Sequence, residues 1–249
     1  MKRRTLLLAA VAAVCLSAGA GAEELVNLMP GSPDEIAAYA AGPQDARGRV
    51  LIIHDWFGLT PSTKAEAVWF GHHGIRAVAI DLYGGKVAET HAEAEKLMNG
   101  LDPAAAQRTI HAALEAIGAK EHPVVIIGYS MGGKIALDAQ IADPAMISGT
   151  ALVYGFGYDD IPDVALSSLD RPVLVATGSK DTGSVSAMDA LQHRMSALGH
   201  PIETYVYPGA DHGYAQALFK GGENFDLKAA MATRNVIADF VGRAAGGAS

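Results

Sequence analysis

Cysteine is nearly absent from this sequence of 249 residues, because Cys15 is the only one. It lies in an apolar N-terminal stretch, and a chain that loses this stretch has neither a thiol nucleophile nor a possible disulfide. Basic residues are also scarce: 19 Lys and Arg stand against 27 Asp and Glu, which gives a net charge of −8. The sequence has no basic patch, and we therefore expect no nucleic-acid partner, since phosphate contacts need clustered lysine and arginine.

The first 22 residues have the pattern of a cleavable signal peptide. Basic residues at positions 2–4 precede an apolar run over 6–16, and small residues at 20–22 offer a cleavage site before Glu23. The pattern predicts a periplasmic or secreted protein, exported by either the general or the twin-arginine route. No later run is apolar and long enough to span a membrane, so we expect no membrane contact after the signal peptide is removed.

Residues 23–249 alternate between short apolar runs and segments with helical spacing, without repeats or an internal linker. Short apolar runs bounded by turn residues predict strands over 36–41, 50–53, 77–80, 124–127, 150–153, 173–176 and 203–207. Helical spacing predicts helices over 62–70, 91–98, 102–118, 132–142, 186–198 and 227–243. This alternation predicts a single α/β domain, in which a mostly parallel central sheet carries helices on both faces.

One glycine-rich turn carries the clearest chemical signal. The segment Gly128-Tyr129-Ser130-Met131-Gly132-Gly133 follows the predicted strand 124–127 directly and leads into a predicted helix. A G-x-S-x-G turn in this context holds a strained serine with an exposed hydroxyl, at a helix N-terminus that favours negative charge. The turn predicts Ser130 as a nucleophile, although ordinary strand-to-helix turns can share this glycine spacing.

A serine nucleophile needs a histidine base and a carboxylate, which follow it along the chain as acid and then histidine in this kind of fold. Of the three downstream histidines, only His212 lies in a turn-rich loop after a predicted strand; His193 and His200 lie within or at the end of a predicted helix. The chain order favours Asp181, in the loop after strand 173–176, as the acid.

The choice of the acid remains open at this point. Asp159 and Asp160 follow the preceding strand and are alternative acids. Oxyanion stabilisation requires two N–H donors, one from the residue after the nucleophile and one from the loop after an earlier strand. Met131 and Trp56 fill these two positions.

Four segments together resemble the dienelactone hydrolase family of α/β-hydrolases: 52–59, 81–85, 128–133 and 208–214. The resemblance implies the α/β-hydrolase fold and the same catalytic residues, with Trp56 and Met131 forming the oxyanion hole. It also implies a small ester or lactone as substrate and no cofactor.

Departures from the family pattern bear on the substrate. Well-studied members have a cysteine in place of Ser130 and a glutamate where this chain has Asp55, which is therefore a possible accessory residue. Members that act on dienelactone hold its carboxylate with two arginines. One should closely follow Tyr83, where this chain has Gly84, Gly85 and Lys86, and the other lies four residues after the histidine, where this chain has Gln216. Dienelactone itself is therefore not the predicted substrate, although Lys86 could replace part of this carboxylate site.

The sequence predicts a serine hydrolase that cleaves a carboxylic ester or lactone through an acyl-enzyme. Candidate pocket residues near the predicted sheet ends are Phe57, Tyr83, Lys86, Tyr154, Phe156 and Gln216. The neighbours His72 and His73 have no third ligand, so no metal is predicted. A thioesterase or acyltransferase with the same residues and a non-catalytic exported ligand-binding protein are the alternatives. The oligomeric state is left open.

Overall fold

The computed structural model describes residues 23–31, 35–200, 202–217 and 222–246, and the predicted signal peptide with Cys15 lies outside them. Its strands are β1 (Glu24–Asn27), β2 (Ala37–Ala41), β3 (Arg49–Ile53), β4 (Arg76–Ile80), β5 (Val124–Tyr129), β6 (Gly149–Val153), β7 (Val173–Gly178) and β8 (Glu203–Tyr207). Its helices are α1 (Pro61–His72), α2 (His91–Asn99), α3 (Pro103–Ala116), α4 (Met131–Ala142), α5 (Asp163–Leu166), α6 (Thr182–Ala197) and α7 (Leu227–Gly246), with a 3₁₀ turn, η1 (Tyr158–Asp160).

The strands form one eight-stranded sheet in the order β1-β2-β4-β3-β5-β6-β7-β8. The six strands from β4 to β8 in this order are parallel, whereas β1 and β2 run antiparallel at one edge. The predicted mostly parallel sheet is therefore confirmed. The sequence prediction missed β1, which lies at the edge of the sheet and is largely exposed and so lacks the continuous apolar pattern of the central strands.

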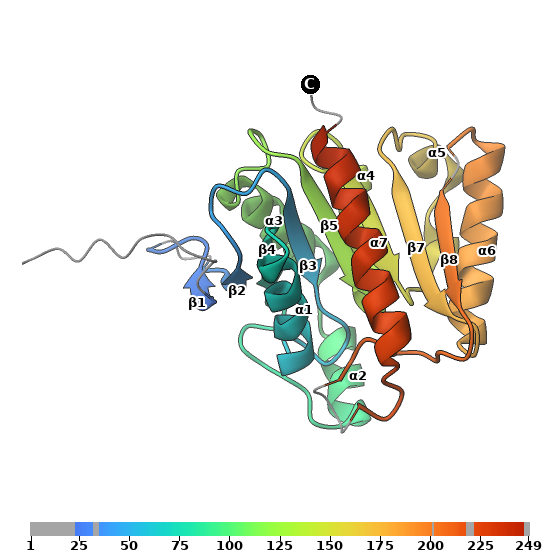
Figure 1. The fold of residues 1–249 in the computed structure, drawn as a ribbon, viewed down its shortest axis with the longest axis horizontal. Helices are drawn as coiled ribbons and strands as arrows, with labels where there is room; N and C mark the ends of the chain where they lie inside the picture. Colours follow the sequence, from blue (N-terminus) through green and yellow to red (C-terminus); the bar gives the residue numbers. More distant parts are fainter. Residues whose placement is uncertain (1–22, 32–34, 201, 218–221, 247–249) are drawn as a thin grey trace, which may run out of the picture.

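Helices cover both faces of the sheet (Figure 1). On one face α1 and α7 bury Phe70, Ile237 and Phe240 against the strands. On the other face α3, α4 and α6 bury residues such as Leu114, Leu137 and Leu191. The central strands β5, β6 and β7 are buried at every residue, because they are covered on both faces.

Local sequence explains where the main helices begin. Thr60 and Asp102 accept hydrogen bonds from the first turns of α1 and α3, and each is followed by a proline that suits the first helical position. Thr90 and Glu93 form a reciprocal capping box at the start of α2. Helix α6 begins at Thr182, four residues before the predicted start, because Asp181 caps it.

Candidate active site

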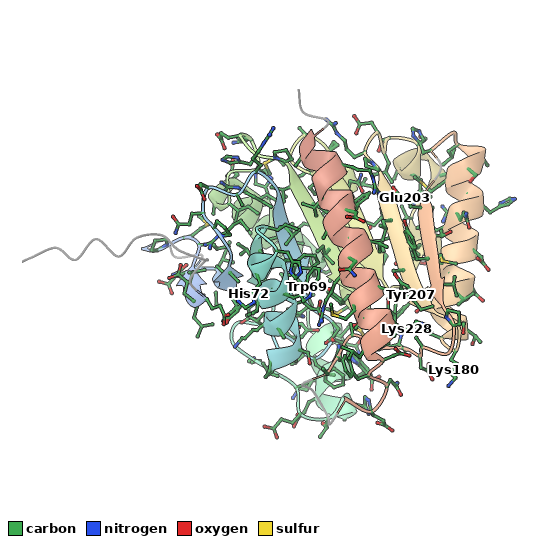
Figure 2. The ribbon with its side chains drawn as sticks, in the orientation of Figure 1. Trp69, His72, Lys180, Glu203, Tyr207 and Lys228 are labelled. Atoms are coloured by element: carbon green, nitrogen blue, oxygen red, sulfur yellow. The ribbon has the colours of Figure 1, made fainter. Side chains whose placement is uncertain are left out.

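The predicted site residues follow the carboxyl ends of the parallel strands. In the sheet, β3 lies between β4 and β5. The chain passes from β3 to β4 on one side, and later adds β5 on the other side and continues outward to β8, so the direction of the connections changes between β3 and β5. Open parallel sheets bind ligands at such a switch point. Figure 2 gives the direction: Glu203 begins β8 at the upper edge, and Tyr207 and Lys180 lie toward the lower edge, where the strands end.

Ser130 occupies a sharp turn between β5 and α4. Its φ of 53° and ψ of −118° lie outside the regions that suit a residue with a side chain, a strain of about 1–3 kcal/mol. Two backbone hydrogen bonds hold the turn: the Ser130 N–H donates to the Val153 carbonyl at 2.9 Å, and the Gly133 N–H donates to the Ser130 carbonyl at 2.8 Å. The hydroxyl is therefore presented at the sheet end by a backbone that the neighbouring strand fixes.

The flanking glycines are required by close backbone approach. A Cβ on Gly128 would lie 2.1 Å from the Gly132 carbonyl oxygen, and a Cβ on Gly132 would lie 2.6 Å from the His54 carbonyl oxygen. Since the obstacles are backbone atoms, they cannot move aside as a flexible side chain could. The G-x-S-x-G spacing thus follows from the packing of α4 against β5 and β3.

Three side chains form a continuous hydrogen-bonded line at this point. The Ser130 Oγ lies 2.9 Å from His212 Nε2, and His212 Nδ1 lies 2.7 Å from Asp181 Oδ2. The second oxygen of Asp181 accepts a hydrogen bond from the Ser184 N–H at 3.0 Å, in the first turn of α6. Burial would raise the pKa of Asp181, but hydrogen bonds from Ser184 and His212 lower it below its usual value. The carboxylate is therefore charged and fixed in orientation.

The alternative acids lie elsewhere. Asp159 and Asp160 belong to the turn η1, and both are exposed. The structure therefore brings Asp181, and neither of them, to His212.

A cavity of about 140 Å³ opens beside Ser130 and His212. It is lined by Asp55, Trp56, Phe57, His91, Ser130, His212, Gly213, Gln216, Glu223 and Asn224. Met131 is the first residue of α4, so its N–H has no partner within the helix and is available beside Ser130. Trp56 lines the same cavity from the loop after β3.

Asp55 is almost completely buried in the wall of this cavity. Its Oδ1 accepts a hydrogen bond from the Phe57 N–H at 2.8 Å, whereas its Oδ2 is buried without a hydrogen-bond partner among the described residues. Burial raises the pKa of Asp55 to about 7, and the hydrogen bond from Phe57 opposes this only in part. A carboxyl group with this pKa can be protonated and neutral near physiological pH.

His54 is fully buried and has a structural role that the sequence analysis did not assign. The Leu82 N–H donates to His54 Nε2 at 3.1 Å, so Nε2 carries no proton, and Nδ1 donates to the Asp55 carbonyl. Burial lowers the pKa of His54, which keeps the ring neutral. This imidazole therefore ties the loop after β3 to the loop after β4 and takes no part in the cavity.

The remaining predicted pocket residues are divided between several places. Phe57 and Gln216 line the cavity with Ser130. Tyr154 is buried beneath His212, with ring centroids 5.2 Å apart, and Phe156 is 45% exposed, with its ring centroid 6.1 Å from that of His212.

Tyr83 and Lys86 line a different, more apolar cavity of about 690 Å³ between the loop after β4 and helices α2 and α3. The Tyr83 hydroxyl donates to Met131 Sδ at 3.3 Å, so this residue supports the Ser130 turn from the side. The loop that carries Lys86 folds toward α2, and Lys86 is not among the residues that line the cavity at Ser130. The structure therefore places both Tyr83 and Lys86 outside the lining of the Ser130 cavity.

Three further residues line the cavity, from α2 and from the segment before α7, and were not predicted from the sequence: His91, Glu223 and Asn224. His91 contacts Trp56 and Phe57, with ring centroids 5.5 and 5.7 Å apart. The Asn224 Nδ2 donates to the His212 carbonyl at 2.9 Å. None of these residues belongs to a recognisable local motif, so only the fold reveals them.

The described part of the chain contains no group of three or more His, Cys, Asp or Glu side chains that could hold a metal ion. His73 instead stacks on Trp69, with ring centroids 3.7 Å apart. Within the same residues, no helix has the length and apolarity needed to cross a membrane.

The profile of the dienelactone hydrolase family matches residues 36–243. Carboxymethylenebutenolidase 1 of Cupriavidus pinatubonensis is 23% identical over 217 residues, which cover 82% of this chain and 90% of that protein.

Solved structures share the fold. A dienelactone hydrolase-like promiscuous phosphotriesterase from metagenomic libraries superposes with a TM-score of 0.75 at 20% identity, over 90% of this chain and 99% of that one. A dienelactone hydrolase from Anabaena variabilis gives a TM-score of 0.69 at 19% identity, with the same coverage. The predicted α/β-hydrolase fold is confirmed.

Proposed function

The chain belongs to the dienelactone hydrolase family and is a carboxylic ester hydrolase; from this premise we propose that it cleaves esters or lactones through an acyl-enzyme on Ser130, with His212 as base and Asp181 as its orienting carboxylate. The observation that carries the proposal is the line of hydrogen bonds from Ser130 Oγ through His212 to Asp181, at 2.9 and 2.7 Å. These distances are those required for proton transfer from nucleophile to base.

In the first half of the reaction, Ser130 Oγ attacks the ester carbonyl carbon while its proton passes to His212 Nε2. Asp181 remains ionised and stabilises the imidazolium, because its pKa lies below the usual range. The N–H groups of Met131 and Trp56 hold the oxyanion. As the tetrahedral intermediate collapses, the bond to the leaving oxygen breaks and His212 gives its proton to that oxygen.

In the second half, water replaces the leaving group in the cavity. His212 takes a proton from the water as its oxygen attacks the acyl carbon, and it returns a proton to Ser130 Oγ when the acyl bond breaks. The products are the free acid and the restored enzyme, so no cofactor is consumed. When a lactone is the substrate, the leaving oxygen stays attached to the acyl chain.

The cavity points to a small substrate. Its volume of about 140 Å³ admits a short acyl group, and its described lining residues include no lysine or arginine. The name of the Cupriavidus relative refers to a carboxylate-bearing lactone, but Lys86 lies in another cavity and Gln216 is uncharged. We therefore propose short, uncharged esters or lactones as the substrates.

The test does not depend on the substrate. The protein lacking residues 1–22 is treated with a fluorophosphonate, and its intact mass is measured beside that of Ser130→Ala. We expect one adduct on the parent protein and none on the variant, together with a loss of roughly 10⁴- to 10⁶-fold in kcat on short-chain esters. A parent protein that stays unlabelled, under conditions that label a known esterase, would support the non-catalytic ligand-binding alternative. Parallel assays with thioesters and alcohol acceptors separate the acyl-transfer alternatives.

We also propose that residues 1–22 are a cleaved signal peptide and that the protein acts in the periplasm or outside the cell. The order of basic, apolar and small residues supports this proposal. Removal of the three basic residues at positions 2–4 leaves 16 basic and 27 acidic residues, a net charge of −11.

A further inference from the structure

A buried ion pair lies beneath the candidate active site and is not explained by the reaction. The Arg234 guanidinium on α7 binds the Glu66 carboxylate on α1 through two hydrogen bonds, at 2.9 Å to Oε2 and 2.7 Å to Oε1. The exposed fractions of the two side chains are 12% and 4%. Both charges are therefore removed from water, at a desolvation cost that apolar side chains of the same size would avoid.

One side chain, that of Tyr129, connects the ion pair to the residue before Ser130 in the chain. The Tyr129 hydroxyl donates to Glu66 Oε2 at 3.1 Å, and Tyr129 immediately precedes Ser130. The Tyr129 ring is 4% exposed, and its backbone pairs with Val153 at the end of β5. Its ring is thus held at the tip by a charged acceptor and at the base by the sheet.

The same ring also connects to the histidine. The Tyr129 ring centroid lies 5.9 Å from that of Tyr154, and Tyr154 packs edge-on against His212 at 5.2 Å. Tyr154 and Ser130 are the two residues other than glycine with positive φ among the described part of the chain, at 39° and 53°. They follow the neighbouring strands β6 and β5. Tyr154 therefore packs against the Tyr129 ring, and Ser130 is the residue that follows Tyr129 in the chain.

Arg234 is fixed on a second side by Trp69 of α1, whose ring centroid lies 6.0 Å from the guanidinium carbon. In Figure 2 the labelled Trp69 lies on α1 beside α7. A planar guanidinium with two hydrogen bonds and an aromatic neighbour has little freedom to rotate. The Glu66 carboxylate that accepts from Tyr129 is consequently fixed as well.

We propose that Glu66, Arg234 and Tyr129 are positioning residues for the hydrolase site: the ion pair fixes the Tyr129 ring, which holds the Ser130 turn and, through Tyr154, the plane of the His212 ring. A directional charged contact sets an orientation, whereas an apolar contact of equal volume would allow the ring to shift. This inference rests on the proposed function of Ser130 and His212, since it concerns their alignment.

The primary test is Tyr129→Phe, which keeps the ring and removes only the hydroxyl. Loss of alignment is expected to lower both kcat and the rate of fluorophosphonate labelling by roughly 10- to 100-fold, with KM changed less than about twofold. The melting temperature is expected to change by only a few degrees, because one neutral hydroxyl is removed. A purely structural role would instead lower the melting temperature and leave kcat per folded molecule unchanged.

The chain contains a matched control on β8. The Tyr205 hydroxyl donates to Glu203 Oε2 at 3.2 Å, and the Arg243 guanidinium binds the same carboxylate at 2.7 Å. This group has the same three residue types as the buried one but lies near the amino end of β8, away from Ser130. The Tyr205→Phe variant is therefore expected to react with the fluorophosphonate, and to turn over substrate, at the rates of the parent protein.

A double-mutant cycle then tests whether the residues act together. Glu66→Gln keeps an acceptor for Tyr129 but leaves Arg234 without its charge partner, and this variant could fail to fold. If it folds, combining it with Tyr129→Phe is expected to lower kcat little further than the more impaired single variant does. If it does not fold, Tyr129→Phe alone decides the matter.

Parent-like kcat and labelling in Tyr129→Phe would overturn the inference, as would an equal loss in Tyr205→Phe. Failure of the proposed function gives a different result, because the parent protein would then form no adduct with the fluorophosphonate.

Discussion

Asp181 binds His212 with one carboxylate oxygen and caps helix α6 with the other. The first oxygen lies 2.7 Å from His212 Nδ1, and the second accepts from the Ser184 N–H at 3.0 Å. Since the helix N-terminus holds the carboxylate in place, the imidazole that it contacts is held in one tautomer, with Nδ1 protonated and Nε2 facing Ser130. The same residue therefore serves the fold and the proposed chemistry.

Asp181→Asn tests the chemical part of this double role. An asparagine can still cap α6, but its amide cannot stabilise an imidazolium and can favour the wrong tautomer of His212. We expect kcat to fall by roughly 10⁴-fold with little loss of stability. Steady-state assays of Asp181→Asn should be run beside Asp159→Asn and Asp160→Asn. Those two exposed residues are expected to keep parent activity, and a large loss in either would contradict the assignment.

Gly132→Ala tests the close packing of the Ser130 turn. The added Cβ would lie 2.6 Å from the His54 carbonyl oxygen, so the backbone must shift. We expect a loss of about 1–3 kcal/mol in the free energy of unfolding and a marked fall in the rate of fluorophosphonate labelling. The control is Gly242→Ala in α7, where the Cβ meets nothing within 4 Å. It is expected to stabilise the protein by up to about 1 kcal/mol without affecting labelling.

Most of the fold could be predicted because its central strands are buried on both faces. Strands such as β5 and β7 each begin with four continuous apolar residues, and this is a local pattern. Strand β1 lacked that pattern because its residues are mostly exposed at the sheet edge. The short α5, of four residues, is too brief to show helical periodicity.

The candidate site was predictable only where a residue belongs to a local motif. Ser130 has its glycine turn, and His212 has its position after a strand. Glu66 and Arg234 carry no such signal, because they are separated by 168 residues and meet only when α1 and α7 pack side by side. The cavity that Lys86 lines carries no local signal either, since the direction of its loop depends on packing against α2.

Export is tested by expressing the full chain in a Gram-negative host. If residues 1–22 are a signal peptide, the periplasmic fraction will contain a protein whose N-terminus is Glu23. Replacement of the basic residues at positions 2–4 by glutamine should slow export and leave uncleaved precursor in the cytoplasm. N-terminal sequencing and intact mass give the cleavage point. Uncleaved protein confined to the cytoplasm in a host with active export would contradict the proposal.

Asp55 predicts an unusual dependence of stability on pH. Burial raises its pKa from 3.8 to about 7 in the folded protein, so between these values the folded chain holds a proton that the unfolded chain releases. Below about pH 4 the residue is protonated in both states and has no effect. As pH rises from 4 to 7, its contribution lowers the free energy of unfolding, by up to about 4 kcal/mol above pH 7.

Asp55→Asn isolates this contribution, because asparagine is similar in shape and stays neutral at every pH. The free energy of unfolding is measured in urea at pH 5 and pH 8. Relative to the parent protein, the free energy of unfolding of the variant should be higher at pH 8 than at pH 5. Asp181 titrates in the opposite sense, since its lowered pKa stabilises the fold above pH 4, but it is present in both proteins and cancels in the comparison. If the free energies of unfolding of parent and variant differ by the same amount at both pH values, Asp55 is ionised at both. The cavity would then carry a permanent negative charge beside Ser130.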